Sequence, residues 1–360
     1  MTRIAASAYR IPTDLPEADG TLSWTSTTMV LVEARSDGHH GIGWTYAPAP
    51  VAALVGELLA PAVEDVGVLD VPDAHERMCR AVRNAGRPGA SSMAISAVDC
   101  ALWDLKARVL GLPLHRLFGA CRADVPVYGS GGFTTYDDAR TREQLEHWVA
   151  GLGIPRVKIK IGEARGGREE RDLARLRLAR LAIGPDAELY ADANGAYSVK
   201  QAVQVAHAAE NLGLRWFEEP VPSDDPAGLR AVRDAVECEV AAGEYGYDLP
   251  YFRDLIGAVD CPQADVTRCG GYTEFLRVAG LARAHNRELS AHCAPHLHAA
   301  VMAAIPNARH IEWFHDHVRI ESMLFDGVLD PDGGTVRPRD GEPGLGLAFR
   351  RPDAERFRVA

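Results

Sequence analysis

The chain has 360 residues, which at roughly 150 residues per domain predicts one large domain or a large domain with a smaller companion. Apolar residues make up 47% of it and charged residues 25%, as in globular proteins, which excludes a mainly disordered or collagen-like chain. The 39 basic and 50 acidic residues leave a net charge of -11. We therefore do not expect nucleic acid as a partner, because binding to phosphate backbones needs a surplus of Lys and Arg.

Seven cysteines are scattered along the chain without a CxxC pair, which argues against a disulfide framework or a zinc ribbon and favours a reducing, cytoplasmic location. The N-terminal residues lack the charged-then-apolar order of a signal peptide, and no apolar run approaches the roughly 18 residues that a membrane span needs. We expect a soluble protein with no membrane partner.

Residues 1–122 have the pattern of an α+β unit. Alternating apolar and polar residues predict three strands of a small antiparallel sheet, at 3–10, 25–35 and 41–46. Apolar residues that recur every three or four positions then predict helices, at 50–59, 72–82 and 91–110. Gly111 and Pro113 end the last of these helices.

From residue 123 onward, short apolar runs alternate with helical stretches about every 25 to 30 residues, which is typical of βα units. The predicted strands are eight, at 125–129, 156–161, 188–192, 214–219, 239–244, 263–266, 288–292 and 310–313. Helical patterns fall between them, for example at 168–183, 199–212, 272–285 and 299–305. Eight βα units close a barrel more naturally than they form an open sheet. We expect the barrel to span 123–322 and the tail, 323–360, to return to the first unit.

Carboxylates stand at the carboxyl ends of three successive predicted strands. Asp192, Glu218 and Glu244 follow one another at intervals of 26 residues (218 minus 192, then 244 minus 218), which puts them at one height in the barrel mouth. Taken singly, each reads as a surface or salt-bridged carboxylate. An evenly spaced set of three needs a cation, and ligands that are all oxygen favour Mg2+.

Two lysines share one face of the second barrel strand. Lys158 and Lys160 point the same way because residues two apart on a strand lie on the same side. The alternative, a pair of solvated surface lysines, fits poorly with the apolar residues Val157, Ile159 and Ile161 around them. An ammonium beside another cation loses its proton more readily, so a lysine near Mg2+ is a candidate base.

A second candidate base lies across the barrel from these lysines. Asp265 ends the sixth strand and His292 the seventh, and a carboxylate on one ring nitrogen raises the basicity of the other. Glu312 on the eighth strand is a candidate acid if burial keeps it protonated. Lys160 and His292 then face each other across the metal. One can remove an α-proton from a metal-bound carboxylate, the other can return a proton or protonate a leaving hydroxyl, and Mg2+ stabilises the ene-diolate.

This set of motifs resembles the enolase superfamily and, within it, the mandelate racemase subgroup. The likeness covers nearly the whole chain and includes the run AISAVDCALWD at 94–104, typical of the family's N-terminal capping domain. It implies an α/β fold in which a modified TIM barrel of the (β/α)7β type carries an N-terminal α+β capping domain. The muconate-type subgroup usually has a lysine on strand six and an aspartate as third metal ligand. Here the run 265–268 reads DVTR and the third ligand is Glu244, which favours the mandelate racemase subgroup.

Carried over position by position, the resemblance implies metal ligands, bases and an acid at the strand ends. The implied ligands of Mg2+ are Asp192, Glu218 and Glu244, with Asn194 as the polar companion of the first. The implied base on the second strand is Lys160, with Lys158 lowering its pKa and contacting a substrate carboxylate oxygen. The implied dyad is Asp265 with His292, and the implied electrophilic acid is Glu312.

Loops of such a capping domain close over the barrel mouth and choose the substrate. Here they would be near 21–26 and 43–48, with Trp24 and Tyr46 as candidates to contact it, although aromatic side chains in short loops are as often core. His296 and His315 are further candidates to line the site. No fixed ligand spacing supports zinc at the histidines of 292–298 or 315–317, and no GxGxxG supports a nucleotide cofactor.

Three functions stay open. The first is an acid-sugar dehydratase, a lyase that turns an aldonate or aldarate into a 2-keto-3-deoxy acid. The second is an isomerase, a racemase or epimerase of a 2-hydroxy acid or related carboxylate, in which Lys160 and His292 act on opposite faces. The third, a barrel that binds without catalysis, is disfavoured because no ligand or base is missing. We expect the dehydratase, because that reaction is common in the subgroup, with a small carboxylate as substrate and a homo-oligomeric assembly.

Overall fold

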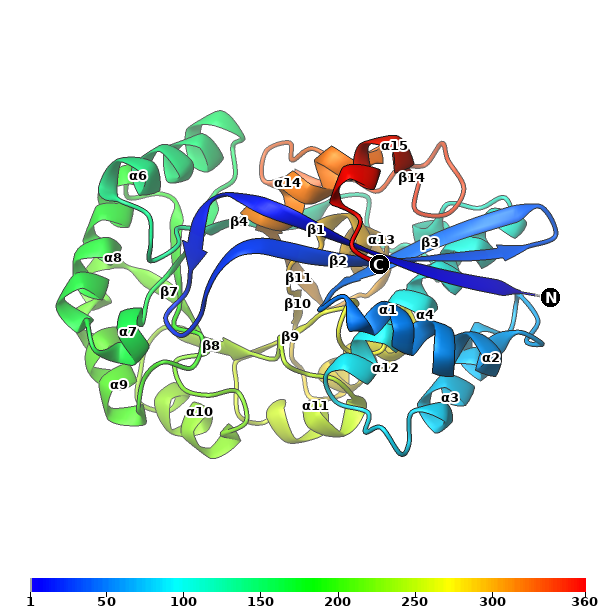
Figure 1. Cartoon of the computed structure of the whole chain (residues 1–360). Helices are drawn as coiled ribbons and strands as arrows, with labels where there is room; N and C mark the ends of the chain where they lie inside the picture. The colour runs from blue at the N-terminus through cyan, green and yellow to red at the C-terminus, as the bar shows by residue number, and fades with distance from the viewer. Residues whose placement is uncertain (1) are drawn as a thin grey trace.

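The computed structural model describes residues 2–360, and its N-terminal part is an antiparallel sheet with helices beside it. The sheet has the order β1 (Arg3–Ala18), β2 (Ser23–Ser36), β3 (His39–Tyr46). The strand positions predicted from the sequence are confirmed, but β1 and β2 run farther than expected. Figure 1 shows their long ends reaching over the barrel, so that the hairpin between them lies at the barrel mouth.

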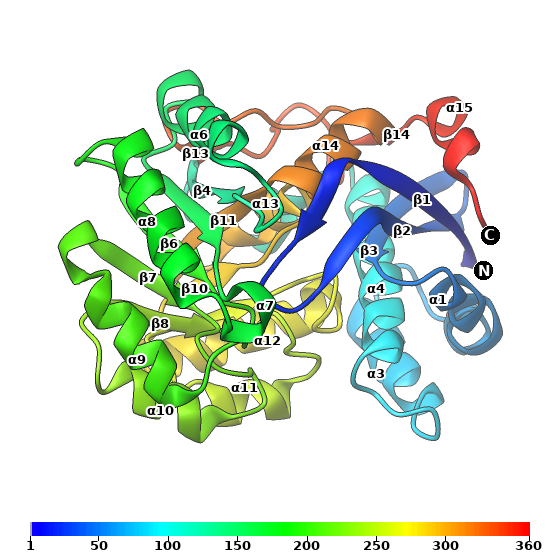
Figure 2. The ribbon, with the colours of Figure 1, turned by 60° about the vertical axis from the view of Figure 1, so that its left-hand side comes forward.

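Four helices follow the sheet, and the last of them lies between the sheet and the barrel (Figure 2). They are α1 (Pro50–Leu54), α2 (Ala60–Val63), α3 (Val71–Ala81) and α4 (Ala90–Val109), with a π-helical turn at Val55–Leu59. Gly41 and Gly43 of β3 let α4 approach closely, since a Cβ at these positions would lie 2.3 Å from the oxygen of Ala101 and 2.4 Å from that of Ala97. Because it is covered from two sides, α4 is buried well beyond the single apolar stripe that its sequence period indicates.

The second part is an eight-stranded parallel barrel, as the sequence predicts. Its strands are β4 (Val125–Gly131), β5 (Arg156–Lys160), β6 (Glu188–Asp192), β7 (Leu214–Glu218), β8 (Glu239–Ala242), β9 (Cys261–Ala264), β10 (Leu289–Ala291) and β11 (Ala308–Phe314). They pair in chain order, and β11 pairs with β4 to close the ring. Five strands, β5, β7, β8, β9 and β10, end one or two residues earlier than expected. As a result, Glu244, Asp265 and His292 stand just beyond their strands rather than within them.

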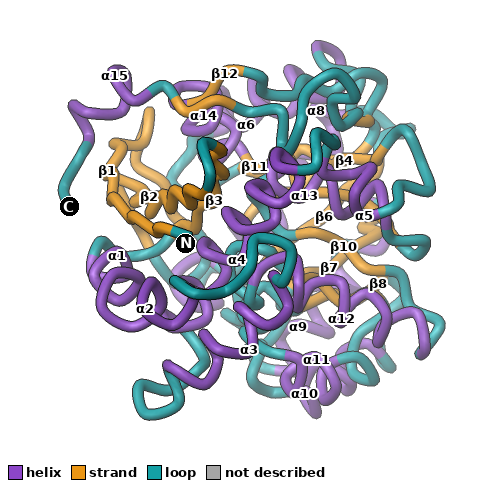
Figure 3. Tube along the Cα trace, turned by 90° about the vertical axis from the view of Figure 1, so that its right-hand side faces the viewer, coloured by secondary structure: helices purple, strands orange, loops and turns teal. Residues whose placement is uncertain are grey.

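Helices surround the barrel, where Figure 3 shows them in purple outside the orange strands. They are α5 (Leu114–Phe118), α6 (Asp138–Glu146), α7 (Glu163–Gly166), α8 (Glu169–Ile183), α9 (Val199–Ala208), α10 (Pro226–Arg233), α11 (Leu249–Leu255), α12 (Gly271–Ala284), α13 (Pro295–Ala304) and α14 (His315–Leu324). The periodicity did not single out α6, α10 and α11. Each is short and begins with an aspartate cap: the side chains of Asp137, Asp225 and Asp248 accept the N–H three residues on.

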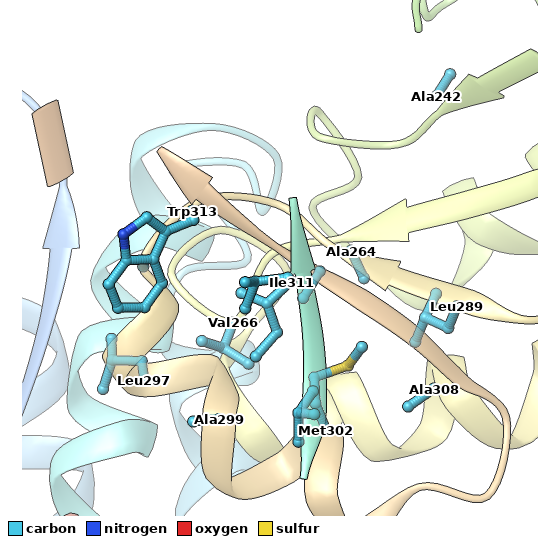
Figure 4. Close-up of a cluster of buried hydrophobic side chains, with 14 of the residues drawn as sticks. Ala242, Ala264, Val266, Leu289, Leu297, Ala299, Met302, Ala308, Ile311 and Trp313 are labelled. Atoms are coloured by element: carbon cyan, nitrogen blue, oxygen red, sulfur yellow. The ribbon is translucent and has the colours of Figure 1, made fainter. Parts of the chain in front are cut away.

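The barrel wall is packed on both of its sides. Figure 4 shows apolar side chains of β9, β10, β11 and α13, among them Leu289, Ile311 and Met302, in the layer between the strands and the helix. Inside the ring, Tyr190 stacks on Trp216 with ring centroids 5.5 Å apart. This packed floor holds the strand ends above it at fixed positions.

The last residues run back over the first part of the chain. Short strands β12 (Phe325–Asp326), β13 (Thr335–Val336) and β14 (Ala348–Phe349) and helix α15 (Arg351–Ala354) precede a terminus that meets β1. Ala8 donates its N–H to the oxygen of Ala360 at 2.9 Å and accepts the N–H of Val359 at 2.8 Å. The division into 1–122, 123–322 and a tail belonging to the cap stays a prediction.

Over residues 2–360, no helix combines the length and the apolar character that crossing a bilayer requires.

Polar contacts fix the cap on the barrel close to the strand ends. Asp99 of α4 accepts the N–H of Thr273 at 3.0 Å, and Thr45 of β3 donates to the oxygen of Thr267 at 2.7 Å. His75 of α3 is fully buried between Asp99, 3.5 Å away, and Glu274 of α12, 3.7 Å away. Burial alone would lower the pKa of His75, but Asp99 and its neighbours raise that pKa to about 10.

We predict that this contact makes the stability of the protein fall as the pH rises. The pKa of His75 in the folded state, about 10, lies above its unfolded value of about 6.5, so its contribution is complete below the unfolded pKa and is lost as the pH approaches 10. Urea unfolding of the wild type should lose on the order of 2–4 kcal/mol over this interval relative to a His75→Gln variant. If the free energy of unfolding changed with pH in the same way for the wild type and His75→Gln, His75 would not be charged in the folded protein.

Candidate active site

Three buried carboxylates meet at the carboxyl end of the barrel. Asp192 ends β6, Glu218 ends β7 and Glu244 follows β8, and one carboxylate oxygen from each lies within 4.8 Å of the others. The predicted spacing has thus brought the three side chains together. Their donor set is all oxygen, and the three residues can hold a metal ion.

The electrostatics of this cluster are those of a site that needs a cation. Burial, together with Asp192 and Glu312, raises the pKa of Glu218 to about 8 against the opposing charge of Lys158. Among residues 2–360, the Oε2 atom of Glu244 is buried and has no hydrogen-bond partner. Buried carboxylates in this state are costly unless a positive charge pairs them, so the cluster fits a divalent ion.

The two lysines of β5 lie against these carboxylates. Lys158 is fully buried, contacts Glu218, and lies 2.8 Å from Glu312. Lys160 donates to Asp192 at 2.5 Å. Burial alone would lower the pKa of Lys160, but Asp192 raises it above its usual value. The expectation of an easily deprotonated Lys160 is therefore not met in this arrangement, because its ammonium pairs with a carboxylate of the metal cluster.

Asp265 and His292 form the expected pair. Nδ1 of His292 lies 2.8 Å from Oδ2 of Asp265. Although burial alone would raise the pKa of Asp265, its hydrogen bond with His292 lowers it, so the carboxylate is ionised and fixes the ring. Nε2 of His292 points the other way and lies 3.4 Å from Oε2 of Glu244. The imidazole is thereby held beside the metal cluster with one nitrogen turned to it.

The surroundings of Glu312 favour its ionised form over the protonated form expected from the sequence. Ser130 donates to its Oε1 at 2.6 Å, and the N–H of Cys293 donates to its Oε2 at 3.0 Å. Burial alone would raise the pKa of Glu312, but Lys158 and His292 lower it well below its usual value. The cations that the fold places beside Glu312 thus disfavour the neutral form that we expected for it.

One cavity of about 530 Å³ opens onto these groups. Lys160 and His292 both line it, together with Asn194, whose N–H donates to Asp192 at 2.8 Å. Trp24 and Tyr46, from the two predicted cap loops, line it as well. The bases of the barrel and the aromatic side chains of the cap therefore face the same space, which has the volume of a small-molecule site.

Two predicted residues lie elsewhere. His296 is not among the residues that line the cavity; it contacts Glu321, which in turn accepts the hydroxyl of Tyr46 at 2.9 Å. His315 contacts Asp14 of β1 at 3.0 Å and joins the cap to the start of α14. Both predictions as lining residues are wrong, because the helices that begin at Pro295 and His315 turn these side chains away from the cavity.

The sequence reasoning missed four residues at the site. Glu219, next to Glu218 in the chain, is fully buried, and burial and Glu244 raise its pKa well above the usual value. The other three line the cavity and are Arg268, 3.2 Å from Glu244, Cys293, next to His292, and His317, stacked on Tyr46. Arg268 ends the run DVTR, and Cys293 directly follows His292. Their closeness in the chain to a candidate ligand or base was the signal available.

We predict that Lys158→Met destabilises the protein, because it leaves the carboxylates of Glu218 and Glu312 buried without their partner. Removing one member of a buried ion pair costs about 3–5 kcal/mol. Chemical unfolding with a metal chelator present should measure this loss, and the exposed Lys200→Met is the matched control, with a change within about 0.5 kcal/mol. Equal stability of the two variants would contradict the pairing described above.

Curated proteins that resemble this chain act on sugar-derived carboxylates. It is 33% identical to 3,6-anhydro-alpha-L-galactonate cycloisomerase of Streptomyces coelicolor, over 97% of each chain. It is 32% identical to L-talarate/galactarate dehydratase of Salmonella typhimurium, over 85% of this chain and 78% of that protein.

Solved structures agree along the whole chain. A mandelate racemase/muconate lactonizing enzyme-like protein from Rubrobacter xylanophilus superposes with a TM-score of 0.96 at 52% identity, over 99% of both chains. A racemase from Streptomyces coelicolor with bound magnesium superposes with a TM-score of 0.93 at 30% identity, again over 99% of both.

Two family models match in sequence order. The model of the mandelate racemase/muconate lactonizing enzyme N-terminal domain matches residues 5–119, and the enolase C-terminal domain-like model matches residues 140–354. Together with the relatives above, these matches show that the chain belongs to the mandelate racemase/muconate lactonizing enzyme family of the enolase superfamily.

Proposed function

We propose that the protein is a Mg2+-dependent lyase that dehydrates an acid sugar, an aldonate or aldarate, to a 2-keto-3-deoxy acid. The observation that carries this proposal is that Lys160 and His292, one from each side of the barrel, line a single cavity beside a buried cluster of three carboxylates. Such a site suits removal of a proton next to a carboxylate group, followed by a second proton transfer on the other side.

Asp192, Glu218 and Glu244 would hold the ion, whose charge, when bound, stabilises the negative charge that develops on the substrate carboxylate. The unpartnered oxygen of Glu244 and the raised pKa of Glu218 support a divalent ion there. A relative in structure, the racemase from Streptomyces coelicolor, carries bound magnesium. Lys158 would contact an oxygen of the same substrate carboxylate.

The proton transfers belong to the two bases. Lys160 takes or returns a proton from the β5 side of the cavity, and Nε2 of His292 does so from the β10 side. Asp265 holds the His292 ring by its Nδ1 atom, so that Nε2 is the nitrogen that meets substrate. In dehydration one base removes the α-proton and the other protonates the departing β-hydroxyl. Trp24 and Tyr46 shield the cavity on the cap side.

The likeness to an L-talarate/galactarate dehydratase and to an arabinonate dehydratase supports dehydration. A second candidate is a racemase or epimerase of a 2-hydroxy acid. The two bases that line one cavity favour this isomerase as much as the dehydratase, because the same pair can exchange a proton on opposite faces of the substrate without elimination.

We also propose a cytoplasmic location and a homo-oligomeric assembly. The location is supported by the seven cysteines, all of which are free thiols. Assembly is an expectation from the family alone.

The test is proton NMR in D2O with Mg2+, in which the protein is offered acid sugars and 2-hydroxy acids. We expect the α-proton signal to disappear and a deuterated 2-keto-3-deoxy product to form. Lys160→Ala and His292→Asn should each lower the rate by at least about a hundredfold, since general acid–base groups contribute about 10²–10⁴-fold.

Lys200→Ala and His207→Asn are the matched controls, because both side chains are exposed on α9. Both variants should turn over substrate at the wild-type rate. Exchange with an epimer appearing and no elimination would move the function to racemase or epimerase. Full activity in both Lys160→Ala and His292→Asn would overturn the assignment of the bases.

A further inference from the structure

We propose that this site also binds a zinc-class divalent cation, in a second metal position formed by His292, Cys293 and Glu312. These three residues offer one nitrogen, one sulfur and one oxygen atom, and all three are buried. No zinc spacing is visible along the chain, because only two of the three ligands are neighbours in sequence. The third comes from β11, which the barrel brings beside the end of β10.

The three donor atoms lie within a few tenths of an ångström of the separations in a tetrahedral zinc site. Sγ of Cys293 lies 3.2 Å from Nε2 of His292 and 3.3 Å from Oε2 of Glu312, and Nε2 lies 3.7 Å from that oxygen. Three ligands of one tetrahedral Zn2+, at the usual bond lengths, are separated by about 3.4–3.6 Å. An ion can therefore enter with shifts of a few tenths of an ångström.

Surrounding hydrogen bonds hold the donors in place. Asp265 engages Nδ1 of His292, which leaves Nε2 facing Sγ of Cys293 and, at 3.4 Å, Oε2 of Glu244. Ser130 and Lys158 engage Oε1 of Glu312, which leaves Oε2 turned to the thiol. Partners of this kind orient the ligands of metal sites and raise their affinity.

The chemistry of the donors selects a different ion from the carboxylate cluster. Thiolate and imidazole ligands favour Zn2+ and other soft cations, whereas Mg2+ prefers oxygen. On binding, the thiol of Cys293 gives up its proton to water, so thiolate and carboxylate together balance the charge of the ion. Cys293 and His292 line the cavity, which gives the ion its route and leaves its fourth position for water or substrate.

Occupation of this position removes Nε2 of His292 from proton transfer, so zinc-class cations should inhibit the enzyme. This consequence rests on the proposed function, whereas the binding itself does not. The binding is therefore tested without substrate.

The probe is Co2+, which substitutes for Zn2+ and gives a near-ultraviolet charge-transfer band when a thiolate binds it. With Mg2+ saturating, titration of the wild type should produce this band with one Co2+ per chain. Cys293→Ala should abolish the band. Cys121→Ala, which removes the exposed thiol, should retain it. Asp192→Asn, which alters the carboxylate cluster and its contact with Lys160 but none of the three proposed ligands, should retain it as well.

Calorimetry with Zn2+ in saturating Mg2+ gives a second readout. Cys293→Ala and His292→Asn should weaken Zn2+ binding by at least about tenfold, with circular dichroism confirming that both are folded. The inference is overturned if the wild type gives no thiolate band, or if Zn2+ binds with unchanged affinity in Cys293→Ala and competes with Mg2+. If the NMR test shows no turnover, the proposed function fails, but the Co2+ titration still shows whether His292, Cys293 and Glu312 bind a metal.

Discussion

The crowding of negative charge at the carboxyl end of the barrel is the constraint on which the site depends. Six carboxylates are buried there, on Asp192, Glu218, Glu219, Glu244, Asp265 and Glu312. An ionised carboxylate that leaves water without a partner is unfavourable by several kcal/mol. The cations that the fold supplies, Lys158, Lys160, Arg268 and the imidazole of His292, each lie against one or more of these groups.

This charge balance links the metal cluster to the bases. Lys160 can act as a base only when another cation pairs with the carboxylate of Asp192, because its own ammonium otherwise does so. His292 touches Asp265 on one side and Glu244 on the other, so the orientation of its free nitrogen and the state of the carboxylate cluster are coupled. Arg268 bridges the same two carboxylates. Substitutions at these positions should therefore have free-energy effects that are not additive.

Much of the fold could be predicted from the sequence, because the period of the apolar residues indicates helices and strands and their repeat every 25 to 30 residues indicates βα units. The strand end at Asp192 was predicted correctly and the end at Glu218 to within one residue, since buried parallel strands are short apolar runs that end in polar residues. Protonation states were less accessible. Glu312 is ionised because Lys158 reaches it from another strand, and a contact 154 residues away (312 minus 158) leaves no local pattern.

The direction of side chains after the strands was equally hard to read. His296 and His317 are both histidines in short polar runs, but the turn that begins α13 sends the first behind Tyr46 and that of α14 brings the second into the cavity. Their roles depend on where each helix begins. Helix starts are among the least certain features of a sequence pattern.

Isothermal titration calorimetry with Mg2+ measures whether a cation completes the charge balance of the barrel mouth. We expect one Mg2+ per chain in the wild type and at least about tenfold weaker binding in Asp192→Asn and Glu244→Gln. The exposed Asp186→Asn should bind Mg2+ as the wild type does. Unchanged Mg2+ binding in both cluster variants, or no binding to the wild type, would show that the three carboxylates do not hold a cation.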